Sequence, residues 1–237
     1  MKDRLLIPEI LDSLPPNDPR AVRSRRDLVF INAMMGNYRW IARRVLLARG
    51  CNNWIELGAG DGPLAVALPD RSTGSVQITG MDLAPRPLRW PTNWDWIQGD
   101  LFETLPLARE GVFSQRPATK EYEECRREQS AVHHRGLVAN LFLHHFDGEE
   151  LSRIGAFVNE SFSRLVLVEP ARYRAFRILG FLLFPFVNDV TRHDLQISIG
   201  AGFRKGELSK ALQLDQSWQI AESTTVFGAH RFEAWRK

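Results

Sequence analysis

The sequence predicts an α/β fold in which a mostly parallel, doubly wound sheet carries helices on both faces. Three observations support this prediction. From residue 53 onward, short apolar runs end in Gly or Asp and are followed by helical stretches, the pattern of βαβ units. Residues 1–48 instead place apolar side chains at helical spacing. The segment 217–237 reads as two neighbouring strands that close the sheet.

Composition narrows the class of protein. The 237 residues are 44% hydrophobic and 25% charged, which is typical of one globular domain with a sizeable core. A net charge of +3 is small for this length, so a nucleic-acid partner is not expected. Cys51 and Cys125 lie far apart in unlike surroundings, and we therefore expect neither a disulfide framework nor a metal cluster.

The N-terminal residues carry acids and prolines where a secretory signal needs an unbroken apolar core. No apolar run reaches the roughly 18 residues that a transmembrane helix requires. The sequence therefore predicts a cytoplasmic protein with no transmembrane segment, and it makes no prediction of oligomeric state.

Two units are expected: an N-terminal helical cap, residues 1–48, and a single compact α/β unit, residues 49–237. Within the cap, the turn signal LPPNDPR at 14–20 separates helices. The arginines of the cap indicate either a solvated helix surface or a phosphate-binding patch.

Five runs after the cap predict the parallel strands: WIEL, VQITGMD, WDWIQ, GLVANLFL and RLVLVEP. The closing hairpin is expected to turn at Phe227 and Gly228. The charge-mixed stretch 111–135 reads as a surface excursion. The apolar stretch AFRILGFLLFPFV, residues 175–187, predicts a core helix, with membrane contact as the alternative and part of it walling an acceptor pocket.

The strongest local signal is WIELGAGDGPLAVAL, where a strand runs into Gly58, Gly60 and Gly62 before a helix. Glycines there allow a tight turn and the close approach of a ligand, although a plain strand-to-helix turn looks the same. Asp82 follows the next apolar run about twenty residues later, where a carboxylate accepts hydrogen bonds from ribose hydroxyls. Asp100 follows the third run, as either a helix cap or an adenine ligand.

The ordered motifs ELGAGDG, MDLAP, GDLF, NLFLHHF and LVEP resemble those of class I S-adenosylmethionine-dependent methyltransferases, over residues 50–170. The resemblance implies a Rossmann-like sheet of seven strands with an antiparallel last strand. It also implies S-adenosylmethionine as cofactor, with S-adenosylhomocysteine as product, and makes residues 49–237 the cofactor-binding domain. The positions it assigns to the cofactor are Glu56, Gly58, Ala59, Gly60, Asp82, Leu83, Asp100, Leu101, Asn140 and Leu141.

The charges in the glycine turn fit this cofactor better than a dinucleotide. S-adenosylmethionine is cationic at its sulfonium and its ammonium, which suits Glu56. Asp61, directly before the helix, would repel a pyrophosphate at that position. The spacing is GxGxG rather than GxGxxG, so a nicotinamide dehydrogenase is disfavoured.

Methyl transfer needs alignment, exclusion of water and, for some acceptors, a base; it needs no metal. The candidate bases are His144 and His145 after the fourth strand and His193 beside Asp194, each of which also has a structural reading as a hydrogen-bonding residue. Four further residues are expected to contact the acceptor: Asn37, Tyr38, Trp40 and Arg192.

The leading hypothesis is a methyltransferase acting on a hydroxyl or an activated carbon of a small aromatic, quinone-like or polyketide-like molecule. One alternative is methylation of RNA or of an amine on a macromolecule, which NLFL disfavours because those enzymes place Asn-Pro-Pro or Asp-Pro-Pro and an aromatic residue there. The other is a non-catalytic regulatory module that only binds S-adenosylmethionine.

Overall fold

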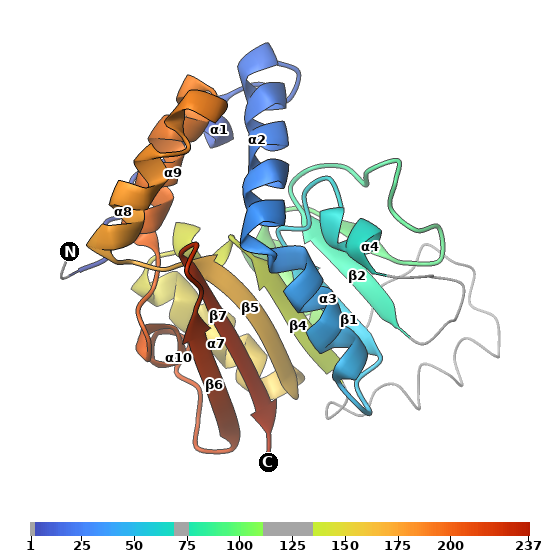
Figure 1. The fold of residues 1–237 in the computed structure, drawn as a ribbon. Coiled ribbons are helices and arrows are strands. Elements are labelled where there is room, and N and C mark those ends of the chain that lie inside the picture. Colours follow the sequence, from blue (N-terminus) through green and yellow to red (C-terminus); the bar gives the residue numbers. More distant parts are fainter. Residues whose placement is uncertain (1–2, 69–75, 111–134) are drawn as a thin grey trace.

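The computed structural model describes residues 3–68, 76–110 and 135–237. Apart from Arg135, the charged stretch 111–135 lies outside the described residues, and so does Cys125. The described chain forms one seven-stranded sheet flanked by helices, with a group of helices standing over one edge of it (Figure 1).

The sheet has the strand order β3-β2-β1-β4-β5-β7-β6. All neighbours pair in parallel except β7, which runs antiparallel to β5 and to β6. The expected antiparallel last strand is therefore confirmed. The strands are β1 (Asn53–Leu57), β2 (Gln77–Asp82), β3 (Trp96–Gln98), β4 (Arg135–Asn140), β5 (Arg164–Pro170), β6 (Trp218–Thr224) and β7 (Ala229–Arg236).

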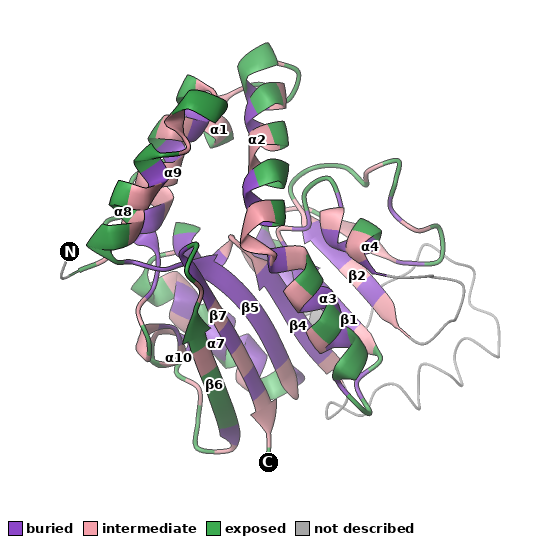
Figure 2. Cartoon of the chain, viewed as in Figure 1, coloured by how far each residue is buried: buried purple, intermediate pink, exposed green. Residues whose placement is uncertain are grey.

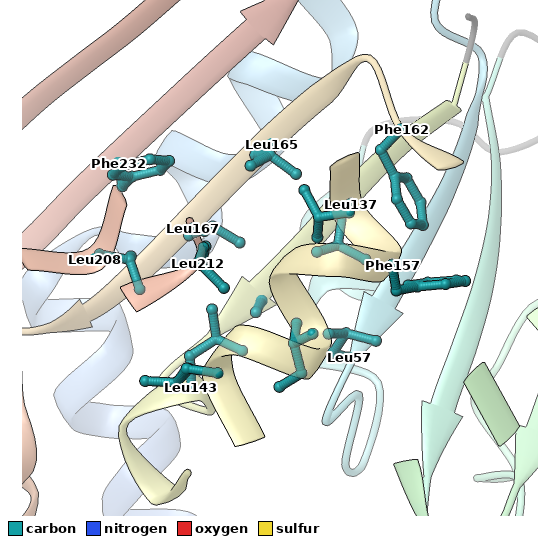
Figure 3. Close-up of a cluster of buried hydrophobic side chains, with 14 of the residues drawn as sticks. Leu57, Leu137, Leu143, Phe157, Phe162, Leu165, Leu167, Leu208, Leu212 and Phe232 are labelled. Atoms are coloured by element: carbon teal, nitrogen blue, oxygen red, sulfur yellow. The ribbon is translucent and has the colours of Figure 1, made fainter. Parts of the chain in front are cut away.

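Two apolar clusters hold helices on the two faces of the sheet. The first packs leucines and phenylalanines of α7 (Gly148–Ser161) and α10 (Glu207–Ala211) against β1, β4 and β5 (Figure 3). The second packs α3 (Asn37–Leu47) and α4 (Pro63–Ala67) against the same strands from the other side. The central strands are buried on both faces, which explains their almost continuous apolar sequences.

The helices above the carboxyl ends of the parallel strands come from two separate parts of the sequence. They are α1 (Ile10–Ser13), α2 (Pro19–Met35), α8 (Arg174–Phe181) and α9 (Asp189–Ala201), with the 3-10 turn η4 (Phe184–Phe186) between the last two. α1 ends at Ser13, and Asp18 caps α2 with Pro19 in its first position, so the predicted turn signal at 14–20 does separate two helices. Gly36 ends α2 at φ 66°. α1 and α2 both pack against α9.

Two elements differ from the sequence predictions. The fourth strand ends at Asn140 instead of continuing through Leu143, because Leu141 adopts φ 52° and the chain enters the 3-10 turn η3 (Leu143–His145). The stretch 175–187 is not a core helix: within α8 only Gly180 is buried, and its outer face is exposed (Figure 2). The remaining helix, α5 (Leu101–Glu110), follows β3, as expected for a βαβ unit.

Candidate active site

The glycine turn after β1 is tied to the end of β2. The backbone N–H groups of Gly58 and Ala59 donate to the carbonyl of Met81 over 2.9 and 3.2 Å. Gly58 and Gly60 have φ 63° and 52°, a region that favours glycine. A Cβ on Gly58 would lie 2.3 Å from the Phe142 ring, whereas one on Gly60 would enter open space at the cavity described below. The turn therefore brings backbone against a space that a ligand can occupy.

Asp82 and Asp100 lie where the resemblance places them, at consecutive strand ends on this cavity. Asp82 is fixed by two backbone donors, Gly60 N–H to Oδ2 and Ala84 N–H to Oδ1, each over 2.8 Å. Asp100 caps α5, since its Oδ1 accepts from Phe102 N–H over 2.8 Å. Asp100 thus fills the capping role and faces the cavity as well.

At the methionine end of the expected site, acceptor atoms outnumber donors. Glu56 is only 2% exposed. The Asn37 and Asn140 side chains both donate to Asn32 Oδ1, over 2.9 and 3.0 Å. Among the described residues, Glu56 Oε2, Asn37 Oδ1 and Asn140 Oδ1 are buried with no hydrogen-bond partner. Because unpaired buried acceptors are unfavourable, this cluster suits a ligand that brings N–H donors and positive charge.

Burial, and secondly the nearby Asp82 carboxylate, raise the pKa of Glu56 to about 8. Burial and the Glu56 charge also raise the pKa of Tyr38, so its phenol stays protonated at neutral pH. A positively charged amine beside Glu56 would favour the carboxylate form and reverse this shift. The residues present therefore fit the ammonium end of S-adenosylmethionine.

A buried carboxylate on β5 shapes the turn that follows β4. Glu169 is fully buried and accepts from the backbone N–H groups of Phe142, Leu143 and His144 over 3.2, 2.8 and 3.2 Å. It also contacts His144 Nδ1 over 2.8 Å. A carboxylate at the start of a helical turn satisfies donors that have no helical partner, which explains why the strand ends at Asn140.

His144 and His145 are adjacent in sequence but differ in charge. His144 lies between two carboxylates, 2.8 Å from Glu169 and 3.5 Å from Glu9. Burial lowers the pKa of His144, but the hydrogen bond to Glu169 and the nearby Glu9 carboxylate raise it to about 9. Burial, and then the charge of His144, lower the pKa of His145 below its usual value. At neutral pH, His144 is therefore an imidazolium and His145 a neutral imidazole.

One cavity of about 870 Å³ joins these groups. One end is formed by the glycine turn, Asp82, Asp100 and Asn140, and the other contains Glu9, Asp12 and both histidines of η3. Much of the remaining wall comes from α2, α8 and α9 and is mostly apolar; its polar residues are Ser24, Arg25, Asn32, Thr191, Asp194 and Ser198. Its apolar residues include Leu28, Ile31, Met34, Met35, Phe176, Leu179, Leu183, Leu195 and Ile199.

No family model matches the sequence, and no curated protein matches it. Solved structures do match the fold. The plantazolicin methyltransferase BpumL in complex with SAH superposes with a TM-score of 0.61 at 10% identity, over 93% of this chain and 92% of that one. The plantazolicin methyltransferase BamL gives 0.60 at 9% identity, over 95% and 92%. The fold is that of the class I methyltransferases.

A third match with this methyltransferase fold is the magnesium protoporphyrin IX methyltransferase ChlM from Synechocystis PCC 6803 with bound SAM. Its TM-score is 0.50 at 13% identity, and the match covers 94% of this chain and 88% of that chain. Identities this low identify the architecture, so the roles of individual side chains are argued below from their contacts.

Within the methyltransferase fold, the cofactor positions predicted from sequence come together. Every one of them except Glu56 lines the cavity, and Glu56 is buried. Of the predicted bases, His144 and His145 line it. Of the predicted acceptor residues, only Tyr38 does.

The remaining predicted residues lie elsewhere. His193 is on the outer side of α9, its side chain 47% exposed and its Nδ1 2.9 Å from Asp194. That carboxylate is already engaged, because Asp194 accepts from the N–H groups of Ile10 and Leu11 at the start of α1. Arg192 pairs with Asp189 and donates to the Phe184 carbonyl.

The other two side chains serve the packing of α3. Asn37 is buried, and its side-chain amide donates to Asn32 Oδ1, as described above. Trp40 packs beside the guanidinium groups of Arg44 and Arg231, whose carbons lie 5.7 and 5.3 Å from the ring centre. Neither residue reaches the cavity wall.

Sequence reasoning missed four polar residues of the site: Glu9, Asp12, Asn32 and Glu169. Glu169 could have been identified from the sequence, because a carboxylate in the apolar run RLVLVEP needs hydrogen-bond donors when that strand is buried. Glu9, Asp12 and Asn32 could not, because helices distant in sequence bring them to the site.

No metal was expected. In the described residues, the potential ligand atoms of Glu9, His144 and His145 lie within 4.8 Å of one another. His144 already contacts Glu9 and Glu169, so its contacts are those of an ion-pair network.

In the part of the chain that the structure describes, no helix is both long and apolar enough to cross a membrane.

Proposed function

We propose that this protein is an S-adenosylmethionine-dependent methyltransferase that modifies a hydroxyl group or an activated carbon of a small aromatic, quinone-like or polyketide-like molecule. The observation that carries the proposal is the single cavity that joins two chemically different ends. One end offers carboxylates and unpaired acceptors for a cationic nucleoside. The other offers a neutral imidazole, with an apolar chamber between them.

At the first end, each residue has a separable task. Asp82, held rigid by two backbone donors, accepts from the ribose hydroxyls. Asp100 and Leu101 contact the adenine. Glu56 and Asn140 accept from the ammonium group, which satisfies their buried oxygens. When bound, the cofactor supplies a methyl group already activated by its sulfonium.

At the second end, His145 removes the acceptor's proton. Its lowered pKa leaves the imidazole unprotonated at neutral pH, which a general base requires. His144 stays protonated between Glu9 and Glu169 and holds η3 in place. Two neighbouring groups whose surroundings push their pKa values apart are typical of acid–base sites.

The apolar wall supports the acceptor class. Side chains of α2, α8 and α9 give the cavity a mostly apolar wall, and Arg25 is the only arginine or lysine among the described residues that line it, which does not suit a nucleic-acid backbone. The neighbours with this fold are named for plantazolicin and magnesium protoporphyrin IX. We also propose a cytoplasmic location, which the free thiol of Cys51 supports.

Calorimetry with S-adenosylhomocysteine tests the cofactor site. Wild-type protein is expected to bind, and Asp82→Ala is expected to weaken binding by about 1.5–3 kcal/mol, the usual scale for hydrogen bonds to a charged group. Glu149→Ala is the matched control, since this exposed carboxylate of α7 does not line the cavity. Absence of wild-type binding, or equal losses in both variants, would contradict the assignment.

Incubation with methyl-labelled cofactor tests transfer. A panel of phenols and quinols is expected to accept label, while RNA is not. Cofactor binding without transfer to any acceptor would instead support a regulatory module. Binding to RNA that weakens steeply with salt would support a macromolecular acceptor.

A further inference from the structure

The mouth of the cavity is rimmed by exposed apolar side chains. Four exposed apolar residues line the cavity: Leu83 follows β2, and the other three are Val29 of α2, Leu182 after α8, and Phe227 of the turn between β6 and β7. The last three are 54%, 67% and 47% exposed. We call these three residues the mouth rim. An opening rimmed by apolar side chains favours the entry of an apolar molecule.

More exposed apolar residues surround the mouth rim. On α2, Phe30 lies beside Val29. Along α8 and η4, and in the β6–β7 turn, the exposed residues are Ile178, Phe181, Phe186 and Val226. We call these five residues the outer patch. In Figure 2 the outer faces of α2 and α8 are drawn as exposed, on the two sides of the space above β5 and β7.

Packing within the protein does not explain why the outer face of α8 is apolar. The inner face of this helix already makes its contacts: a Cβ on Gly180 would lie 3.0–3.6 Å from Gln196, Leu195 and Ile199 of α9. Ile178 and Phe181 point away from that contact and are 68% and 51% exposed. Exposed apolar side chains gathered on one helix in this way mark an interaction site.

The charges beside the outer patch are positive. Residues 173–187 contain Arg174 and Arg177 and no carboxylate. Arg174 lies four residues before Ile178, so the two share a helical face. On α2, Arg23 and Arg26 are exposed and precede Phe30 by seven and four residues, which again is one face.

Two carboxylates on α2 and α9 already have partners. Asp27 accepts from Asn188 N–H and from the Thr191 hydroxyl. Asp189 pairs with Arg192 over 2.8 Å. The outer patch therefore lies beside four exposed arginines, two on α2 and two on α8.

We propose that this surface docks on an anionic lipid bilayer, so that the cavity mouth faces the membrane. Apolar side chains of an interfacial helix enter the boundary of headgroups and acyl chains by about 5–10 Å, while arginines pair with lipid phosphates. Docked in this way, the protein takes an apolar acceptor directly from the bilayer into the chamber beside His145. The docking stands independently of methyl transfer, but the delivery of the acceptor rests on the proposed function.

Vesicle flotation of the full chain tests the docking. Vesicles of phosphatidylcholine with an equal amount of phosphatidylglycerol are expected to carry the protein up the gradient, and pure phosphatidylcholine to carry at least about tenfold less. The double variant Arg174→Gln/Arg177→Gln is expected to lose about tenfold or more in affinity for the anionic vesicles. The double variant Ile178→Glu/Phe181→Glu is expected to lose vesicle binding.

Val66→Glu is the matched control, since Val66 is an exposed apolar residue of α4, away from the mouth rim. It is expected to bind vesicles like wild type. All variants should keep their affinity for S-adenosylhomocysteine, so a failure of docking is distinguishable from a failure of the cofactor site.

Equal binding to both vesicle types, or equal binding by the Ile178/Phe181 variant, would overturn the proposal. A second copy of this chain is the other occupant to test. If wild type is dimeric without vesicles and Ile178→Glu/Phe181→Glu makes it monomeric, the outer patch is a protein interface and the membrane assignment is wrong.

Discussion

At one end, beside the carboxyl ends of the parallel strands, the cavity is walled by loops that each follow one strand. At its opposite end, it is walled by helices from distant parts of the sequence. The glycine turn, Asp82 and Asp100 are held by backbone hydrogen bonds within and between neighbouring loops. His144 instead depends on Glu169 from β5 and Glu9 from the N-terminal segment. Cofactor binding thus follows from strand order, while acceptor chemistry depends on how the helices pack.

This contrast predicts that variants at the two ends lose different activities. His145→Ala should reduce the methyl-transfer rate by about 10²–10⁴-fold, the contribution of a general base, and should leave affinity for S-adenosylhomocysteine unchanged. His193→Ala is the matched control, because His193 is exposed and does not line the cavity. Transfer assays and calorimetry on the same preparations check both expectations.

The pH profile sharpens this prediction. Since the base must be unprotonated and the pKa of His145 is lowered, wild-type transfer should hold down to about pH 6.5 and fall only at lower pH. A loss in His193→Ala equal to that in His145→Ala would contradict the assignment of the base.

The same contrast explains what the sequence could predict. The candidate strands, the closing hairpin and the grouping of the predicted cofactor positions around one cavity follow from patterns contained in short segments, such as ELGAGDG and MDLAP. The roles of His193 and Arg192 could not be judged, because side-chain direction on α9 depends on its packing against α1 and α2.

The stretch 175–187 is a second case in which the sequence alone could not predict the outcome. Its apolar composition predicted burial, but an apolar sequence is also compatible with a wall beside a cavity mouth. α8 has few elements to cover it: it packs on α9 and leaves Ile178 and Phe181 exposed. Only the tertiary arrangement separates the two outcomes.

The second expected effect concerns stability at the helical end. The pKa of His144 is raised to about 9, above its unfolded value of about 6.5. Its contribution to stability is therefore complete below about pH 6.5 and is lost as the pH rises towards 9, a change on the order of 3 kcal/mol. The difference in unfolding free energy between wild type and His144→Gln should shrink over that range.

Chemical denaturation at several pH values measures this difference. Groups that titrate equally in both proteins cancel from it, and the charges facing His144 are those of Glu9, Glu169 and His145. A difference that stays constant from pH 6.5 to 9 would mean that His144 is neutral in the folded protein.

The smallest expected effect lies at the carboxyl ends of the parallel strands, where Glu56 is protonated in the free protein below its pKa of about 8. Because an ammonium group favours the carboxylate form, binding S-adenosylhomocysteine must release this proton at lower pH. Wild-type affinity should therefore rise by up to about tenfold per pH unit between pH 6 and 8. Glu56→Gln should bind more weakly and lose this dependence on pH, as calorimetry at three pH values would show. A flat wild-type profile would mean that Glu56 is already ionised without ligand, and that the unpaired acceptors beside Asn140 serve another donor.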